Sequence, residues 1–437
     1  MQRIPFLSGI VKLMYMLASI VLWVYAGIML YVWYFARFTP ESAVLVRIVA
    51  SILSDLVWVP LGFSIWFTAI SAIVTRIARP VKGVTVSIVG IVSGSIVAIL
   101  FVVSHHTAFA LLFIPLIFFV ARYGMTCYSG ASKKRILLHY TPTAVMLLLF
   151  VFYYRSQLIP DFGNGNQHVD IKLMGYNIFA HADYEERMKV LDTIKHEAPD
   201  VLCLMEFNPM RDPELFEREL GDMYPYRMIG DDLTRWTRSA AYILSRYPLK
   251  KISVEKISNK KDRHVNFIFV EMNVNGRIVN LVNYHLITVG HRIARAAWDK
   301  FSSREQVEKA TSTEAAIDEE KYEQVQYLID KISTFREPTI LCGDLNDTPN
   351  SRAYHVLDTR FINTFSQKGW GLGSSFGKSW LMRRFRKVPR MSSFTRDVMR
   401  IDHIFVSSDF EVVSSKVIGD AEGSDHKPIV TELRFVK

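Results

Sequence analysis

Three short motifs in the C-terminal half carry side chains that can hold a divalent cation and move a proton beside a phosphate. They are the segments Leu341–Asn346, Arg400–Phe405 and Gly423–Pro428. Each places polar side chains at an end of a short apolar run, where a strand presents side chains to a cleft at a sheet edge. A phosphate ester resists attack because its oxygens are already negative, so hydrolysis requires positive charge and an activated water. Carboxylate, amide and imidazole groups gathered in one cleft would supply both.

Further polar residues end other apolar runs, and each one alone is a weak signal. Asn177, Glu206 and His285 follow such runs, as Asp344 and Asn346 do. A lone glutamate there is usually a solvated strand end, a lone histidine is usually structural, and Asp-x-Asn is also typical of an Asx turn. Their joint occurrence along one chain favours a shared site.

The pattern of apolar residues predicts more strands than helices. The hairpin signal Asn275-Gly276 joins two of the strands. A mixed α+β arrangement, as two layers or a sandwich, therefore fits better than a doubly wound parallel sheet. The expected strands are Val169–Tyr176, Asp200–Met205, Ala240–Leu244, Phe267–Val274, Ile278–Tyr284, Thr339–Cys342, Ile401–Val406 and Ile429–Phe435, and the expected helices are Tyr184–His196 and Glu320–Ile332.

The order of these motifs resembles that of the endonuclease/exonuclease/phosphatase superfamily, which includes DNase-like nucleases and neutral sphingomyelinases. The resemblance covers roughly Val169–Val436. It implies a DNase-like, four-layered α/β sandwich with two central mixed sheets. The motifs that carry it are Met174–Asn177, Leu204–Glu206, Tyr242–Pro248, Asn283–Leu286, Gly343–Asn346, Arg400–Phe405 and Ser424–His426.

The resemblance also implies a metal site. Glu206 corresponds to a metal ligand, with Asn177 and Asp425 close by. Mg²⁺ prefers oxygen ligands and keeps several waters, so one or two carboxylates suffice. We therefore expect Mg²⁺ or Mn²⁺ as the cofactor.

The remaining site residues have catalytic roles in the resemblance. His426 corresponds to the general base, oriented and made more basic by Asp402. Asp344 and Asn346 would hold the attacking water or the phosphate, and Asp344 would help to protonate the leaving oxygen. His285 would donate to the phosphate or act as a general acid.

Three other residues are expected to lie outside the chemistry. His403 directly follows Asp402 on a predicted strand and so points to the opposite face. Cys203 and Cys342 lie inside apolar strand-like runs and are expected to be small buried hydrophobes. The chain has three cysteines, which indicate no disulfide framework.

The N-terminal part of the chain predicts a membrane domain. Residues 1–157 hold twelve Lys and Arg against two acids, a net charge of +10 that equals that of the whole chain. The basic pI therefore does not indicate nucleic acid, because the rest of the chain is neutral. About five spans are expected in this polytopic helical domain, at Met14–Phe35, Ile48–Val74, Gly83–Val103, His106–Val120 and Leu137–Tyr153.

The distribution of Lys and Arg predicts the orientation of the spans. With the N-terminus inside, most of these residues fall in cytoplasmic segments, and the outer loops between the spans carry only Arg37 and Arg47. This places a linker over 158–168 and a catalytic domain over 169–437 outside the cytoplasm. Within that domain, 287–320 is expected to be a surface insertion or a lid, and the basic loop 378–390 to be solvated or to bind anions.

Together these patterns predict a multi-pass protein of the cell membrane with an extracytoplasmic, metal-dependent phosphoesterase domain. The substrate stays open between a lipid headgroup, nucleic acid and a small phosphate ester. The alternative is a catalytically silent, membrane-anchored binding protein that retains the fold. The sequence does not indicate an oligomeric state.

Overall fold

The computed structural model describes Val24 and most of the chain from His168 onward. The chain divides into two compact units, and the described residues from His168 onward belong to one of them. The predicted membrane spans, nearly all of the linker and the basic loop lie outside the described residues. Among the described residues, none of the helices is both long and apolar enough to cross a bilayer. The described residues are Val24, 168–180, 182–208, 212–230, 240–258, 264–287, 304–349, 351–370, 373–376, 400–419 and 423–436.

Twelve strands of the described residues form two six-stranded mixed sheets. The first sheet has the order β11 (Phe410–Val417), β12 (Ile429–Phe435), β1 (Ile171–Asn177), β2 (Val201–Phe207), β4 (Ala240–Ser245) and β3 (Tyr226–Ile229). The second has the order β5 (Leu249–Ser258), β6 (His264–Val274), β7 (Arg277–His285), β8 (Thr339–Asp344), β10 (Asp402–Val406) and β9 (Ile362–Asn363).

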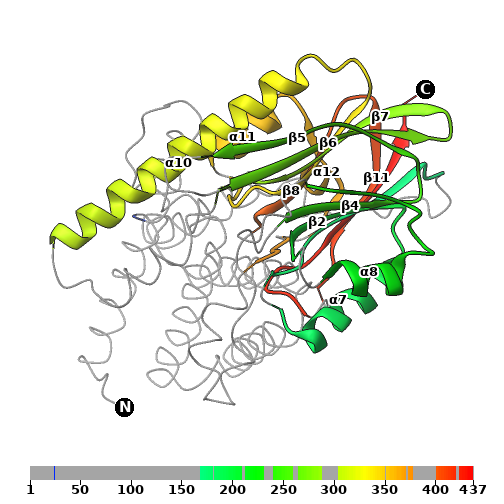
Figure 1. The fold of residues 1–437 in the computed structure, drawn as a ribbon. Helices are drawn as coiled ribbons and strands as arrows, with labels where there is room; N and C mark the ends of the chain where they lie inside the picture. The colour runs from blue at the N-terminus through cyan, green and yellow to red at the C-terminus, as the bar shows by residue number, and fades with distance from the viewer. Residues whose placement is uncertain are drawn as a thin grey trace, which may run out of the picture. The chain divides into compact units, whose positions relative to one another are not determined.

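Helices cover the outer face of each sheet, which gives four layers (Figure 1). The first sheet packs against α7 (Tyr184–Glu197) and α8 (Asp212–Leu220). The second packs against α10 (Arg304–Ile332) and α11 (Arg352–Asp358), and the short α12 (Thr364–Lys368) follows β9. The predicted sandwich of two mixed sheets is confirmed for this part of the chain.

The core between the sheets is apolar and includes two of the cysteines. Cys203 on β2 and Cys342 on β8 are free, fully buried and part of this inner cluster. Gly175 on β1 lies directly above Cys342, because a Cβ there would come within 2.6 Å of the Cys342 sulfur. The prediction that both cysteines are buried hydrophobes is confirmed.

Each sheet contains one parallel pair of strands, and both pairs end on the same side of the molecule. β1 pairs parallel with β2, and β7 pairs parallel with β8. Parallel neighbours need a crossover connection, and these crossovers contain α7 and α10 respectively. A capping box between Asp183 and Glu186 starts α7 within the first of these crossovers.

The helix predicted over Glu320–Ile332 begins earlier than expected, because α10 starts at Arg304, within the segment expected to be an insertion. The segment 304–319 is rich in Glu and Ala, which favour a helix without giving it an apolar face. Apolar periodicity therefore indicates only the C-terminal half of this helix. The first part of the expected insertion, residues 288–303, lies outside the described residues.

Candidate active site

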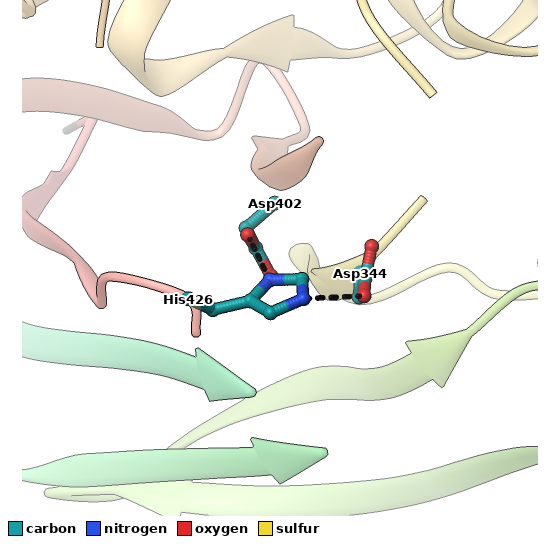
Figure 2. A group of neighbouring side chains, drawn as sticks. All are labelled: Asp344, Asp402 and His426. Atoms are coloured by element: carbon teal, nitrogen blue, oxygen red, sulfur yellow. Dashed lines mark hydrogen bonds and ion pairs between the residues drawn. The ribbon is translucent and has the colours of Figure 1, made fainter. Parts of the chain in front are cut away.

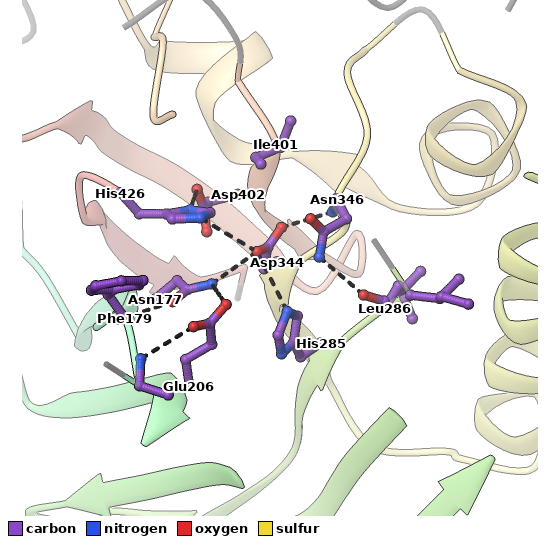
Figure 3. A network of polar contacts seen from close by, with 12 residues as sticks. Asn177, Phe179, Glu206, His285, Leu286, Asp344, Asn346, Ile401, Asp402 and His426 are labelled. Atoms are coloured by element: carbon purple, nitrogen blue, oxygen red, sulfur yellow. Dashed lines mark hydrogen bonds and ion pairs between the residues drawn. The ribbon is translucent and has the colours of Figure 1, made fainter. Parts of the chain in front are cut away.

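The ends of five strands bring the predicted site residues together (Figure 3). Asn177 ends β1, His285 ends β7 and Asp344 ends β8, while Glu206 is the last residue but one of β2. β10 runs antiparallel to β8, so its first residue, Asp402, lies opposite Asp344. His285 lies opposite Asp344 on the other side. Asp344 is therefore the centre of the group.

Asp344 is a buried carboxylate with polar neighbours on several sides. Its Oδ2 accepts a hydrogen bond from Asn177 Nδ2 at 3.0 Å, and lies 3.7 Å from His285 Nε2 and 3.9 Å from His426 Nε2. Burial and the negative charge of Asp402 raise the pKa of Asp344 to about 6, although the two histidines and Asn177 favour the ionised form. Asp344 can therefore hold or release a proton near neutral pH.

His426 bridges the two aspartates (Figure 2). Its Nδ1 lies 2.8 Å from Asp402 Oδ2, and its ring packs against Phe376 with centroids 4.7 Å apart. Burial lowers the pKa of His426, but the charges of Asp402, Asp344 and Asp425 outweigh burial and raise it to about 10. The predicted contact between the imidazole and Asp402 is present, and in this state the ring holds both of its protons.

A short segment around Ser375 fixes the position of Asp402. The buried Ser375 hydroxyl accepts hydrogen bonds from the backbone N–H groups of Ile401 and Asp402, each at 3.2 Å. The Ser375 carbonyl accepts from the N–H of Lys427 at 2.8 Å. One residue thus ties the strand that carries Asp402 to the turn that carries His426.

Glu206 presents a negative, half-buried carboxylate beside Asn177. Its Oε1 accepts from Asn177 Nδ2 at 3.2 Å and its Oε2 accepts from the N–H of Ala180 at 3.1 Å. Burial raises the pKa of Glu206, but the charges of His285 and His426 and these hydrogen bonds outweigh burial, so the net shift is downward. The group is therefore ionised, as a metal ligand must be.

The donor set around Glu206 fits a hard cation such as Mg²⁺ or Mn²⁺, because it offers carboxylate oxygen. The turn of Asp425 lies against this region, since the Ser424 hydroxyl donates to the Asn177 carbonyl at 2.7 Å. Asn177 differs from the expected ligand, because its Oδ1 accepts from the N–H of Phe179 while its Nδ2 faces the carboxylates. Glu206 and Asp425 are therefore the better candidates to hold a cation.

A second group of side chains is also close enough to hold an ion. One ligand atom from each of Asp344, Asp402 and His426 lies within 4.8 Å of the others. However, His426 Nδ1 and Asp402 Oδ2 lie at hydrogen-bond distance, so the proton between them occupies the place that a cation would need. This geometry favours proton transfer over metal binding at these three residues.

Lys321 on α10 holds the loop after β8. Its ammonium donates to the Asn346 carbonyl at 2.7 Å and lies 3.2 Å from Asp347 Oδ2, in the protein interior. Asn346 has a left-handed backbone with φ of 53°. In this conformation its N–H donates to Asp344 Oδ1 at 2.7 Å, and its Nδ2 donates to the Leu286 carbonyl at 3.0 Å.

Arg187 on α7 holds the loop after β1 in a similar way. Its guanidinium is buried, donates to the carbonyls of Ile178 and Phe179, and lies 3.1 Å from Asp212 Oδ2. The Asp212 carboxylate also accepts from the N–H of Asn208 at 2.7 Å. This ion pair therefore joins the loop after β1 to the loop after β2.

The structure places the eight predicted site residues at one end of the sheets, and hydrogen bonds or ion pairs connect seven of them. Asp425 is placed there by its position between Ser424 and His426. His403 points away, as predicted: it is buried, and its Nε2 lies 2.9 Å from the Asp347 carbonyl. Sequence reasoning missed Ser375, Arg187 and Lys321, because their types and spacing do not distinguish them from surface residues.

The arrangement defines a two-sheet α/β scaffold with an acid–base and carboxylate site at the strand ends. Residues 174–426, more than half of the chain, match the model of the Endonuclease/Exonuclease/phosphatase family. The chain belongs to this family. The matched segment begins three residues before Asn177 and ends at His426.

Solved structures with low sequence identity resemble this chain. The human Nocturnin catalytic domain is 18% identical, with 61% of this chain and 94% of that chain covered and a TM-score of 0.41. Truncated TDP2 of Caenorhabditis elegans is 18% identical, with 61% and 98% covered and a TM-score of 0.42. A Bacteroides vulgatus endonuclease/exonuclease/phosphatase is 17% identical, with 61% and 99% covered and a TM-score of 0.43. No curated protein sequence matches the chain. At these scores the likenesses support no argument about activity.

Proposed function

We propose that this protein is a membrane-anchored, divalent-metal-dependent phosphoesterase that hydrolyses phosphodiesters, with its catalytic domain outside the cytoplasm. The observation that carries the proposal is the pairing of His426 with Asp402 next to Asp344. Membership of the family supports a phosphate ester as the substrate. The predicted spans and the bias of their flanking charges support the membrane anchor and its orientation.

The metal would be held by Glu206 and Asp425, with Mg²⁺ or Mn²⁺ as the ion. When bound, the cation supplies positive charge to the phosphate oxygens and lowers the pKa of nearby groups. Glu206 suits this role because it is ionised and its second oxygen is anchored by the N–H of Ala180. Asn177 positions that carboxylate by donating to it and to Asp344.

The proton transfers fall to His426 and Asp344. Asp402 accepts from Nδ1 of His426 and so directs its Nε2 toward Asp344. Transfer of the Nε2 proton to Asp344 Oδ2, 3.9 Å away, leaves this nitrogen able to take a proton from the attacking water. Asp344, with a pKa of about 6, can give a proton to the leaving oxygen. His285, about one fifth exposed, is placed to donate to a phosphate oxygen.

Within this class we favour a lipid headgroup diester over nucleic acid. Residues after 157 are electrically neutral in sum, and polyanion binding depends on phosphate contacts by Lys and Arg. A domain tethered next to a bilayer also meets lipid headgroups at high local concentration. A panel of plasmid DNA, RNA, sphingomyelin, glycerophospholipids and inositol phosphates tests this choice on the purified chain.

Two substitutions test the reaction itself. Glu206→Gln and His426→Ala should each abolish hydrolysis and leave the fold intact, and His196→Ala, at an exposed position on α7, should have no effect. EDTA should stop turnover, and Mg²⁺ or Mn²⁺ should restore it. If every member of the panel stays uncut by wild-type protein with metal present, the silent binding protein becomes the better account. Full activity of either variant would remove that residue from the mechanism.

The orientation has its own test. Protease added to intact cells should cleave the catalytic domain if it lies outside the cytoplasm. Protection of this domain in intact cells, with cleavage only after lysis, would overturn the five-span topology. The result does not depend on enzymatic activity.

A further inference from the structure

One buried amide crosses from the second sheet to the first directly beneath the site. Asn283 on β7 is fully buried, and its neighbours on the adjacent strands are the apolar residues Ile268 and Cys342. Its Nδ2 donates to the Leu204 carbonyl at 2.9 Å and to the Tyr242 carbonyl at 3.2 Å. Both acceptors belong to the opposite sheet. A polar side chain in an apolar layer costs free energy, so its two hydrogen bonds require an explanation.

These two carbonyls mark the point where the pairing of β2 with β4 becomes irregular. Leu204 pairs with Tyr242, but the next pair is Phe207 with Ala240, so β2 contains one extra residue. Such a bulge bends a strand and redirects a side chain. Glu206 lies inside the bulge and has a left-handed φ of 55°, a conformation that a glutamate rarely adopts.

The bulge decides where the Glu206 carboxylate lies. It brings Oε1 to 3.2 Å from Asn177 Nδ2 and Oε2 to 3.1 Å from the N–H of Ala180. A strained backbone conformation persists only when the surrounding structure holds it in place. The amide of Asn283 holds the last regular pair of residues before the bulge, on the side that faces the other sheet.

We propose that Asn283 is a positioning residue for the metal site: by binding the Leu204 and Tyr242 carbonyls, it fixes the bulge that presents Glu206 to the cation. This inference rests on the proposed function, in which Glu206 is a metal ligand. Asn283 does not touch the cation or the substrate. Groups that orient a metal ligand typically change metal affinity by about 10- to 100-fold when they are removed.

The test compares metal binding by two matched variants of the purified chain. Asn283→Leu keeps the side-chain size and removes the donor. Asn280→Leu is the control, because Asn280 is a buried amide on the same strand whose Nδ2 donates to the Glu337 carbonyl at 3.4 Å, away from the site. Mn²⁺ binding is measured by electron paramagnetic resonance without substrate. We expect roughly tenfold weaker binding for Asn283→Leu and wild-type affinity for Asn280→Leu.

A second measurement uses turnover. Asn283→Leu should raise the Mg²⁺ concentration for half-maximal activity by a similar factor, while kcat at saturating Mg²⁺ returns to within a few-fold of wild type. A purely structural role would lower the amount of active protein and leave the metal dependence unchanged. If Asn283→Leu does not fold, Asn283→Ser, which keeps one hydroxyl donor, should weaken Mn²⁺ binding by a smaller factor.

The outcomes separate this inference from the proposed reaction. Wild-type affinity for Mn²⁺ in folded Asn283→Leu, or an equal loss in Asn280→Leu, would overturn the inference. If wild-type protein binds Mn²⁺ but cleaves no substrate, the proposed reaction is refuted, and the Mn²⁺ affinities of the variants still decide the inference.

If wild-type protein binds no Mn²⁺, the proposed metal site is refuted. Amide exchange then decides whether Asn283 fixes the bulge. Amide exchange at residues 204–207 should then be faster in Asn283→Leu than in wild type or Asn280→Leu. Unchanged exchange in Asn283→Leu would refute the inference.

Discussion

His403 gives a stability prediction that can be worked out from the structure. The ring lies in the interior next to Tyr354, and its Nε2 donates to the Asp347 carbonyl at 2.9 Å. Burial and the nearby positive charge of Arg400 lower the pKa of His403 from 6.5 to about 3. The folded protein therefore keeps this side chain neutral well below pH 6.5.

The sign of the effect follows from proton linkage. Above pH 6.5 the side chain is neutral in both states and contributes no pH dependence. Below pH 6.5 the unfolded chain binds a proton that the folded protein does not, so stability is lost as the pH falls from 6.5 toward 3. With these two pKa values, the loss between pH 7.5 and pH 5 is about 2 kcal/mol from this residue alone.

The variant His403→Gln isolates this contribution, because glutamine keeps a neutral donor and does not titrate. Amide exchange of β10, corrected for intrinsic rates, reports the free energy of opening this part of the fold at each pH. We expect the wild-type protein to lose about 2 kcal/mol more than the variant between pH 7.5 and pH 5. His196→Gln, at an exposed position on α7, is the control and should follow the wild-type curve.

The reasoning would be refuted if the free energies of opening of wild type and His403→Gln differed by the same amount at every pH. That result would mean that the buried imidazole takes up a proton as readily as it does in the unfolded chain. A variant that is less stable at every pH, but whose curve is flatter toward acid, would support it. The test therefore depends on how steeply the free energy of opening changes with pH, and not on how much stability the substitution removes at any single pH.

Three further variants test other parts of the site. Asp402→Asn should lower hydrolysis by roughly a hundredfold to ten-thousandfold and leave Mn²⁺ binding unchanged, because the ring loses its negatively charged partner but the metal ligands stay. Lys321→Met should lower the free energy of unfolding by about 3 kcal/mol, measured by thermal unfolding, because a buried carboxylate loses its partner. The matched change Lys331→Met on the same helix removes only an ion pair at the surface and should lower it by less than about 1 kcal/mol. Gly343→Ala should prevent folding, seen as loss of the native circular dichroism signal, because a Cβ would overlap the Tyr284 carbonyl. Wild-type behaviour of any of these three variants would contradict the corresponding contact.

The strands that lead into the site could be predicted because they are continuous apolar runs buried on both faces. β1, β2, β8 and β10 were found within one or two residues of their ends. The segments Leu249–Ser258 and Phe410–Val417 were missed, although both are strands. They alternate apolar residues with Lys, Ser and Glu, and each pairs at an outer position of its sheet, so their sequences also fit an exposed loop.

The site was predictable for a related reason. Asn177, Glu206 and Asp344 each follow an apolar run, so the sequence itself marks where they emerge from the core. The residues that hold them give no such signal. Lys321 lies in a helix as one of many charged residues, and Asn283 interrupts an apolar run as many surface residues do. Their partners are distant in sequence, so only the folded chain shows what they contact.

The positions of these supporting residues indicate why the fold needs its outer layers. Left-handed conformations at Phe179, Glu206 and Asn346 bring the site groups together, and each costs about 1–3 kcal/mol. Arg187 on α7 donates to the Phe179 carbonyl and Lys321 on α10 donates to the Asn346 carbonyl, so each crossover helix supplies a buried cation to one loop. Helices that only covered apolar surface would need no charge there. The two outer layers therefore also hold the strained loops in place from opposite sides of the sandwich.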